Sequence, residues 1–168
     1  MKKTLIVCAM NEELVILKEK LKLEVFNEEG PWTIYKKPNR EVYAIVSRVG
    51  KVHGGAALSY AIVKISPEQI IGIGVAGGVS PNLKIGDIVI CDKAMQHDMD
   101  VTAFGYPHGQ VPGLESVYIK SDSKLIQLLE DIAKKYYDES IKVGAVMSGD
   151  CFVFHLTLIV CAGRKAVV

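Results

Sequence analysis

The feature that most constrains the fold is an alternation of two patterns along the chain. Short, continuous apolar runs such as Thr4–Met10 and Gln69–Val75 are typical of strands buried on both faces. Between such runs lie segments whose apolar residues recur at helical spacing, as in Lys51–Ile65. Strands that alternate with helices predict the α/β class. We expect a single three-layer domain in which a central mixed, largely parallel sheet carries helices on both faces.

Turn residues and capping residues set the expected limits of these elements. Asn11 is predicted as the N-cap of the first helix, with Glu12 and Glu13 in its first turn, where acidic side chains favour the helix dipole. Ser121 is predicted to cap a later helix. Further strands are predicted at Glu24–Phe26, Trp32–Lys36, Glu41–Ser47, Asp87–Cys91, Val117–Lys120 and Ile141–Met147. Residues 95–115 show no period, and a loop of that length is usually functional or part of an interface.

Composition and charge exclude several classes of protein. Apolar residues make up 49% of the chain, which excludes a disordered, weakly hydrophobic sequence. Twenty basic residues against 19 acidic ones give a net charge of +1, so neither nucleic acid nor an anionic membrane is an expected partner. The most apolar stretches, Ile70–Val79 and Cys151–Gly163, are shorter than the roughly 18 residues of a membrane span.

The cysteines predict a reducing compartment. Cys8, Cys91, Cys151 and Cys161 show no spacing typical of a zinc site. We interpret them as reduced thiols that act as small core residues in a cytoplasmic protein. No export signal is predicted, because acidic residues follow the first apolar run where a cleavage site would lie.

The segment Gly72-Ile-Gly74-Val-Ala-Gly77 matches the GxGxxG pattern of dinucleotide sites. That site needs a helix that opens at the last glycine, and Pro81 with the Gly86-Asp87 turn leaves no room for one before the next strand. A dinucleotide site is therefore the weaker interpretation. The stronger one is a tight turn at the carboxyl edge of a strand, where α/β sheets place ligands.

Two acidic clusters could carry chemistry. Glu12 and Glu13 follow the first strand, and a carboxylate there can act as a general base if it faces a cleft, although exposed acids at a helix start are common. His97-Asp98-Met99-Asp100 contains hard-metal and zinc ligand types, but no distant partner is identifiable, so a satisfied polar cluster is the expected outcome.

Several short blocks, taken in order, resemble one family. They are Ala9–Glu13, Ser47–Val52, Gly74–Gly78, Leu83–Asp87, His97–Tyr106, Gly109–Gly113 and Ser148–Phe152. The set resembles the 5′-methylthioadenosine/S-adenosylhomocysteine nucleosidases of the nucleoside phosphorylase superfamily. The resemblance covers residues 4 to about 154. It implies a nucleoside phosphorylase-like domain over residues 1–154, followed by a divergent tail over 155–168.

The resemblance implies hydrolysis of the N-glycosidic bond, which releases adenine and a thioribose, by a cofactor-free homodimer that binds a small adenine nucleoside. It makes Glu13, and not the neighbouring Glu12, the base that activates water. In the implied site, the backbone of Ala76 and Gly77 lines the nucleoside, Phe152 stacks on adenine and the Val153 backbone bonds to its edge. Met10 and Val49 contact the ribose and 5′-thio side, and Val101, Phe104, Tyr106 and Pro112 lie near the 5′ pocket.

Three departures from the family pattern are visible. Val75 stands where the family usually has Ser or Thr, and Arg48 stands where it usually has glycine. Arg48 is hypothesised to bind phosphate or another anion. Residues 155–168 lack the Met-Glu and Ser-Asp pairs that the resemblance implies, so a truncated or frameshifted family member is expected.

Three readings of function remain open at this point. The first is the nucleosidase, with a purine nucleoside phosphorylase as its alternative. The second is a catalytically impaired remnant that binds nucleosides. The third is the dinucleotide-binding module at Gly72–Gly77.

Overall fold

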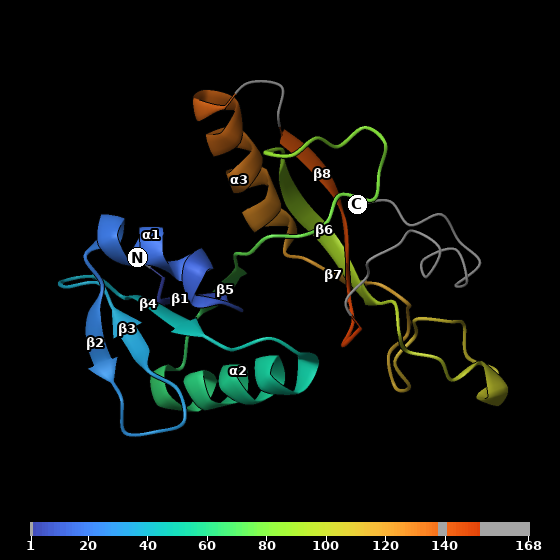
Figure 1. Cartoon of the computed structure of the whole chain (residues 1–168), viewed down its shortest axis with the longest axis horizontal. Coiled ribbons are helices and arrows are strands. Elements are labelled where there is room, and N and C mark those ends of the chain that lie inside the picture. The colour runs from blue at the N-terminus through green and yellow to red at the C-terminus, as the bar shows by residue number, and fades with distance from the viewer. Residues whose placement is uncertain (1, 138–140, 152–168) are drawn as a thin grey trace. The chain divides into compact units, whose positions relative to one another are not determined.

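The computed structural model describes residues 2–137 and 141–151, which divide between Ala76 and Gly77 into two compact units (Figure 1). Each unit has its own sheet, and each is described by itself below.

The first unit is a five-stranded sheet covered by two helices. Its strands run in the order β2 (Glu24–Asn27), β3 (Ile34–Lys36), β4 (Val42–Val46), β1 (Thr4–Cys8) and β5 (Gln69–Gly72). β1 lies parallel to both β4 and β5, whereas β2, β3 and β4 pair antiparallel. The two helices are α1 (Asn11–Leu21) and α2 (Lys51–Ile65). The carboxyl ends of β1, β4 and β5 therefore meet at one edge.

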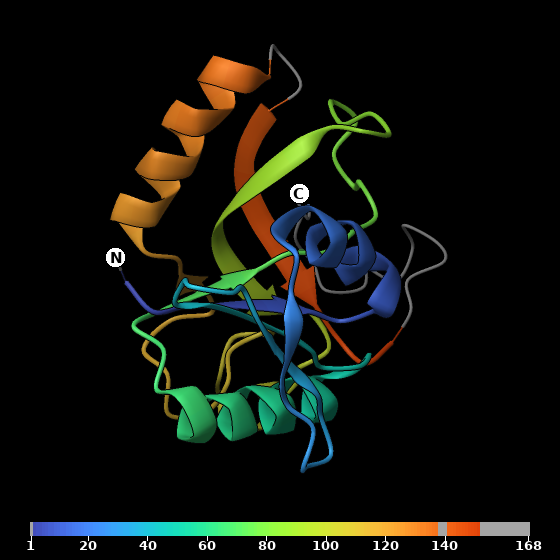
Figure 2. The same cartoon turned by 90° about the vertical axis from the view of Figure 1, so that its left-hand side faces the viewer.

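The two faces of this sheet bury different helices (Figures 1 and 2). On one face, Leu5 and Ile45 pack against Ala57 and Ala61 of α2. On the other face, Ile6 and Cys8 pack against Leu14 of α1. Alternate residues of β1 thus point to opposite faces, and both faces are covered, which explains why the strand is an unbroken apolar run.

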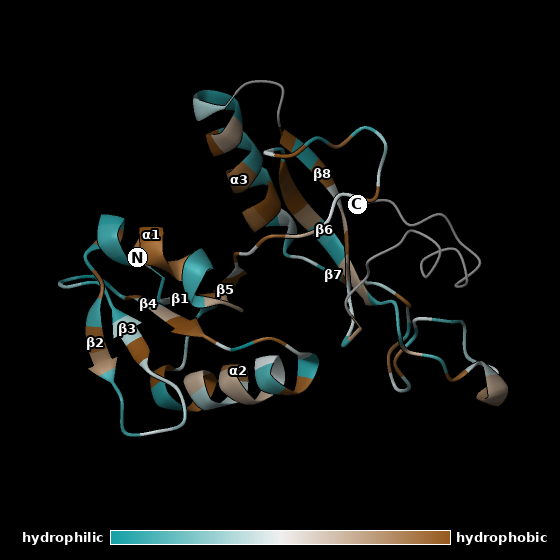
Figure 3. Cartoon of the chain, in the orientation of Figure 1, coloured by the Kyte–Doolittle hydropathy of each residue, from teal (hydrophilic) through white to brown (hydrophobic). Residues whose placement is uncertain are grey.

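Among the described residues, the second unit contains a three-stranded sheet, one α-helix and a short 3-10 helix. Its strand order is β7 (Ile119–Lys120), β6 (Ile88–Gln96) and β8 (Ile141–Ser148), with β6 parallel to β8 and antiparallel to β7. Helix α3 (Ser123–Tyr136) contacts β6 and alternates between polar and apolar residues along its length (Figure 3). A short 3-10 helix spans Thr102–Phe104 within the long loop.

The α/β class with mixed strand directions is confirmed, although the strands expected in one central sheet form two hydrogen-bonded sheets among the described residues. The proposal that residues 1–154 make one domain stays a prediction. The predicted helix Lys51–Ile65 has those bounds in the structure. The strand predicted to end at Val75 ends at Gly72, because Ile73 is the last of these residues whose N–H bonds to β1, at the Val7 carbonyl.

Two predicted helix caps are wrong by one residue. Asn11 is the first helical residue, and Met10 holds the N-cap position with extended backbone angles. Asp122, not Ser121, caps α3, because its carboxylate accepts a hydrogen bond from the Leu125 N–H at 2.8 Å. Both Ser and Asp favour this position, so side-chain type alone could not separate neighbours.

Within the part of the chain that the structure describes, no helix is long and apolar enough to cross a membrane. The same residues contain no group of three or more His, Cys, Asp or Glu side chains that could hold a metal ion.

Candidate active site

The candidate site of the first unit lies at the edge where β1, β4 and β5 end. Two backbone bonds hold the segments that leave these strands: the Ser47 N–H donates to the Cys8 carbonyl at 2.8 Å, and the Ile73 N–H donates to the Val7 carbonyl at 2.9 Å. The pairing carries Met10, Val49 and Ala76 beyond the same edge of the sheet. All three were predicted to contact a nucleoside.

Glu13 is fixed at this edge by three backbone donors. Its Oε2 atom accepts hydrogen bonds from the N–H groups of Ala9 at 2.8 Å and Met10 at 3.0 Å. Its Oε1 atom accepts one from the Val75 N–H at 3.0 Å. The carboxylate therefore links the chain that leaves β1 to the chain that follows β5. Such bonds to an ionised group are stronger than neutral ones and fix its position.

Gly74 leaves the space that this carboxylate occupies. A Cβ atom built on Gly74 would lie 2.9 Å from Glu13 Oε1, closer than non-bonded carbon and oxygen normally approach. The second glycine of the GxGxxG pattern is thus explained by a protein carboxylate at the turn, with no phosphate required.

No helix follows this turn in residues 73–87, all of which the structure describes, before β6 begins at Ile88. The helix that a dinucleotide site needs is therefore absent from this segment, as the sequence predicted.

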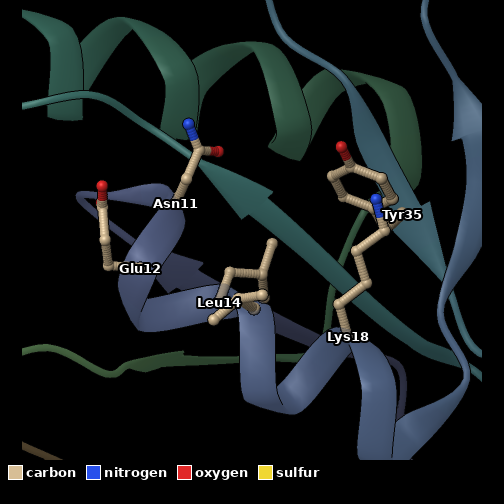
Figure 4. Close-up of a pocket in the computed structure, with 6 residues that line it drawn as sticks. Asn11, Glu12, Leu14, Lys18 and Tyr35 are labelled. Carbon is tan, nitrogen blue, oxygen red and sulfur yellow. The ribbon is translucent and has the colours of Figure 1, made fainter.

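The neighbouring acid, Glu12, has a different environment. It lines an open hollow of about 310 Å³ beside α1, together with Asn11, Leu14, Val15, Lys18 and Tyr35 (Figure 4). The Lys18 ammonium lies over the Tyr35 ring, 4.2 Å from its centre. The structure thus separates the two adjacent carboxylates: Glu12 faces this hollow, whereas Glu13 bonds to the strand edge.

Cys8 lies at the end of β1 and is fully buried. Burial raises the pKa of its thiol to about 11, and the negative charge of Glu13 acts in the same direction. The thiol is therefore protonated near neutral pH and behaves as a small apolar core residue, as predicted for the cysteines. Cys91 is half-buried and Cys151 is exposed, so the core interpretation is wrong for Cys151. Cys161 lies outside the described residues.

Arg48 and Val49 form an exposed turn between β4 and α2. Arg48 has a φ of +75°, in the left-handed region that glycine adopts without strain. This backbone conformation gives a physical reason why glycine suits the position. The Val49 side chain is 68% exposed, so it is accessible to a ligand at this edge.

The other predicted contacts belong to the second unit. Val101 is half-buried, whereas Gly77, Phe104, Tyr106 and Pro112 are exposed. Asp100 lies in the loop that carries Val101, Phe104, Tyr106 and Pro112, and its carboxylate accepts bonds from the Thr102 hydroxyl at 2.7 Å and the Thr102 N–H at 3.1 Å. These bonds hold the pKa of Asp100 below its usual range. Phe152 and Val153 lie outside the described residues.

The His97–Asp100 segment packs against the turn that follows β8. The Asp98 carboxylate accepts a hydrogen bond from the Asp150 N–H at 2.9 Å, and the His97 N–H donates to the Ser148 carbonyl at 3.0 Å. The cluster is therefore a satisfied polar contact, as predicted.

Comparisons with known proteins decide the family. Residues 3–156 match the phosphorylase superfamily. The chain belongs to that superfamily. It is 35% identical over 150 residues to a 5′-methylthioadenosine/S-adenosylhomocysteine nucleosidase of Exiguobacterium, an alignment that covers 88% of this chain.

Two solved structures share the fold of this chain. The nucleosidase of Neisseria meningitidis in complex with methylthio-immucillin-A superposes with a TM-score of 0.89 at 30% identity, covering 98% of this chain and 73% of that one. Futalosine hydrolase of Helicobacter pylori superposes with a TM-score of 0.88 at 27% identity, covering 98% of this chain and 71% of that one. The resemblance to the nucleosidase family is confirmed. The chain spans 64% of the length of the Exiguobacterium relative.

Sequence reasoning missed the groups that build the edge. The Val75 backbone N–H binds Glu13, although Val75 stood out in the sequence only for a missing hydroxyl. Trp32 donates its indole N–H to the Ser47 carbonyl, and His53 contacts the Val49 carbonyl. None of these contacts follows a sequence period, so the pattern of residues gave no signal for them.

Proposed function

We propose that the chain carries the site of a nucleosidase that hydrolyses the N-glycosidic bond of 5′-methylthioadenosine and S-adenosylhomocysteine. The observation that carries the proposal is the Glu13 carboxylate, held by three backbone N–H groups at the edge where the parallel strands β1, β4 and β5 end. The similarity to nucleosidases over most of the chain supports the same conclusion.

Glu13 is proposed to act as a general base. In hydrolysis of a glycosidic bond, the anomeric carbon gains oxocarbenium-like positive charge while water attacks it. A carboxylate beside that carbon accepts the proton of the water and stabilises the positive charge. Because backbone donors fix both oxygens of Glu13, little reorganisation is needed at the moment of reaction.

The remaining predicted contacts complete the proposal. Met10 and Val49 would contact the ribose side, and the Ala76 and Gly77 backbone would line the nucleoside. Val101, Phe104, Tyr106 and Pro112 would surround the 5′ substituent, and the exposure of Phe104, 82%, supports a surface available to a ligand or partner. Phe152 would stack on adenine and the Val153 backbone would bind its edge. A homodimer and a cytoplasmic location remain predictions.

Adenine release from 5′-methylthioadenosine, with and without phosphate, tests the proposal. Release that does not depend on phosphate supports hydrolysis. Release that requires phosphate would instead identify the phosphorylase alternative. No release from a folded sample would contradict the proposed activity and favour a nucleoside-binding chain without catalysis.

A matched pair of variants then tests the assignment of the base. Glu13→Gln is expected to reduce release by about 10²–10⁴-fold, the usual contribution of general acid–base catalysis. Glu12→Gln removes the adjacent charge, which lines a separate hollow, and is expected to change the rate by less than about twofold. Equal losses in the two variants would contradict the assignment.

A further inference from the structure

The turn that enters α2 is held by an indole from another part of the first unit. Trp32, the only tryptophan of the sequence, lies just before β3 in the segment that joins it to β2. Its Nε1 atom donates a hydrogen bond to the Ser47 carbonyl at 3.1 Å. Ser47 is 4% exposed and directly precedes the Arg48-Val49-Gly50 turn.

Each of four successive carbonyls in this turn has its own donor. The Ser47 carbonyl accepts from Trp32, and the Arg48 carbonyl accepts from the Ser47 hydroxyl at 3.0 Å. The Val49 carbonyl lies 2.9 Å from Nδ1 of His53, a contact that needs a proton on that nitrogen because a carbonyl only accepts. The Gly50 carbonyl accepts from the Gly54 N–H at 2.9 Å, as the first turn of α2.

The turn needs such support because its backbone is strained. Arg48 has a φ of +75°, whereas the φ of +102° at Gly50 is one that glycine adopts without strain. The left-handed conformation is unfavourable for a side chain such as that of arginine. Without the hydrogen bonds, other conformations of residues 48–50 would compete with this one.

Trp32 is itself kept in place to bond to the Ser47 carbonyl, because its ring packs against α2. Its ring centre lies 6.0 Å from that of Tyr60 in α2. The Tyr60 hydroxyl donates to the Asn27 side chain at 2.6 Å, at the end of β2. A Cβ atom on Gly30 would collide with the Tyr60 ring, so the segment between the strands packs closely on α2. The indole therefore belongs to a rigid contact between the hairpin and the helix.

We propose that Trp32 is a positioning residue for nucleoside binding: its indole N–H fixes the Ser47 carbonyl and thereby the turn that presents Val49 to the sugar. The inference rests on the proposed function, because Val49 is a predicted ribose contact. It goes beyond that function by placing a determinant of affinity in the hairpin between β2 and β3. Trp32 itself contacts no substrate in this account.

Trp32→Phe tests this role, because phenylalanine keeps an aromatic ring against Tyr60 but has no N–H. Loss of one neutral hydrogen bond lowers the fraction of chains with a competent turn, so the KM for 5′-methylthioadenosine is expected to rise by about two- to tenfold. The kcat is expected to change by less than about twofold, because bound chains already have the competent turn. Tyr60→Phe is the matched control, since it removes the bond to Asn27 from the same contact and leaves the indole bond.

The control separates positioning from stability. If hairpin attachment alone matters, Tyr60→Phe and Trp32→Phe should raise KM equally, and this result would overturn the inference. A KM increase confined to Trp32→Phe supports it. The single indole ¹H–¹⁵N cross-peak of the unmodified chain gives a second readout, expected to shift as 5′-methylthioadenosine is added. An unchanged cross-peak, with nucleoside binding shown by calorimetry, would overturn the inference and leave the proposed function intact. Absence of both binding and adenine release would refute the proposed function, and the inference with it.

Discussion

Replacing Glu13 with glutamine should lower the stability of the folded chain, separately from its effect on the rate of adenine release. The carboxylate accepts bonds on both oxygens, from Ala9 and Met10 on one and from Val75 on the other. A glutamine amide has one oxygen and one NH₂ group, and the NH₂ group cannot accept a hydrogen bond. The variant therefore loses at least one bond to an ionised acceptor, worth about 1.5–3 kcal/mol. We expect a loss near the lower limit, about 2 kcal/mol, because the site is partly exposed to water.

Urea unfolding at neutral pH measures this loss, with Glu12→Gln as the control. Glu12 has no comparable set of backbone donors among the described contacts, so its variant should change the free energy of unfolding by less than about 0.5 kcal/mol. A Glu13→Gln chain as stable as the unmodified one would refute the reasoning that these backbone bonds anchor the carboxylate.

Three further substitutions probe the same edge. Gly74→Ala should lower the free energy of unfolding in urea by about 1–2 kcal/mol, because the new Cβ would displace Glu13 Oε1. Gly72→Ala is the control and should not lower it, because a Cβ there would meet no atom within 4 Å. Equal effects of the two substitutions would contradict this explanation. Because the thiol pKa of Cys8 is raised from 9.0 to about 11 in the folded chain, the unfolded chain loses this proton at a lower pH than the folded chain does. About 2 kcal/mol of stability is therefore present below pH 9 and is lost as the pH rises to about 11. Unfolding measured from pH 8 to 11 should show that decline, and Cys8→Ala should lack it; a decline of the same size in the variant would assign it to other groups. Arg48→Gly should raise the urea midpoint by an amount equivalent to about 0.5–1 kcal/mol, because it relieves a left-handed arginine. A lower midpoint would show that the arginine side chain contributes more than its backbone strain costs.

The elements of the first unit could be predicted because local patterns and burial agree there. β1 is covered by α1 on one face and α2 on the other, and an unbroken apolar run is what such burial requires. The division of the strands into two sheets could not be predicted, because pairing partners are not encoded in the period of a single strand. The predicted cap of α3 was wrong by one residue for a simpler reason. Ser121 and Asp122 are both favourable N-cap residues, and the sequence alone does not show at which of them the helix begins.

Only those site residues that belong to recognisable motifs could be predicted from the sequence. The resemblance placed Glu13, Met10, Val49 and Ala76 on one site, and the structure brings them to one edge of one sheet. The backbone donors that fix Glu13 could not be predicted, because an N–H group is present at almost every residue and carries no sequence signal. The sequence predicted that Gly74 lies in a tight turn, but it did not show that the Glu13 carboxylate occupies the space beside it.

Hydrolysis of 5′-methylthioadenosine in ¹⁸O-labelled water tests the central claim most directly. If water held by Glu13 attacks the anomeric carbon, free adenine appears together with a thioribose that carries one ¹⁸O atom at C1, with or without phosphate, and Glu13→Gln forms both products slowly. A sugar 1-phosphate without the label, or no adenine from folded chain, would contradict the account.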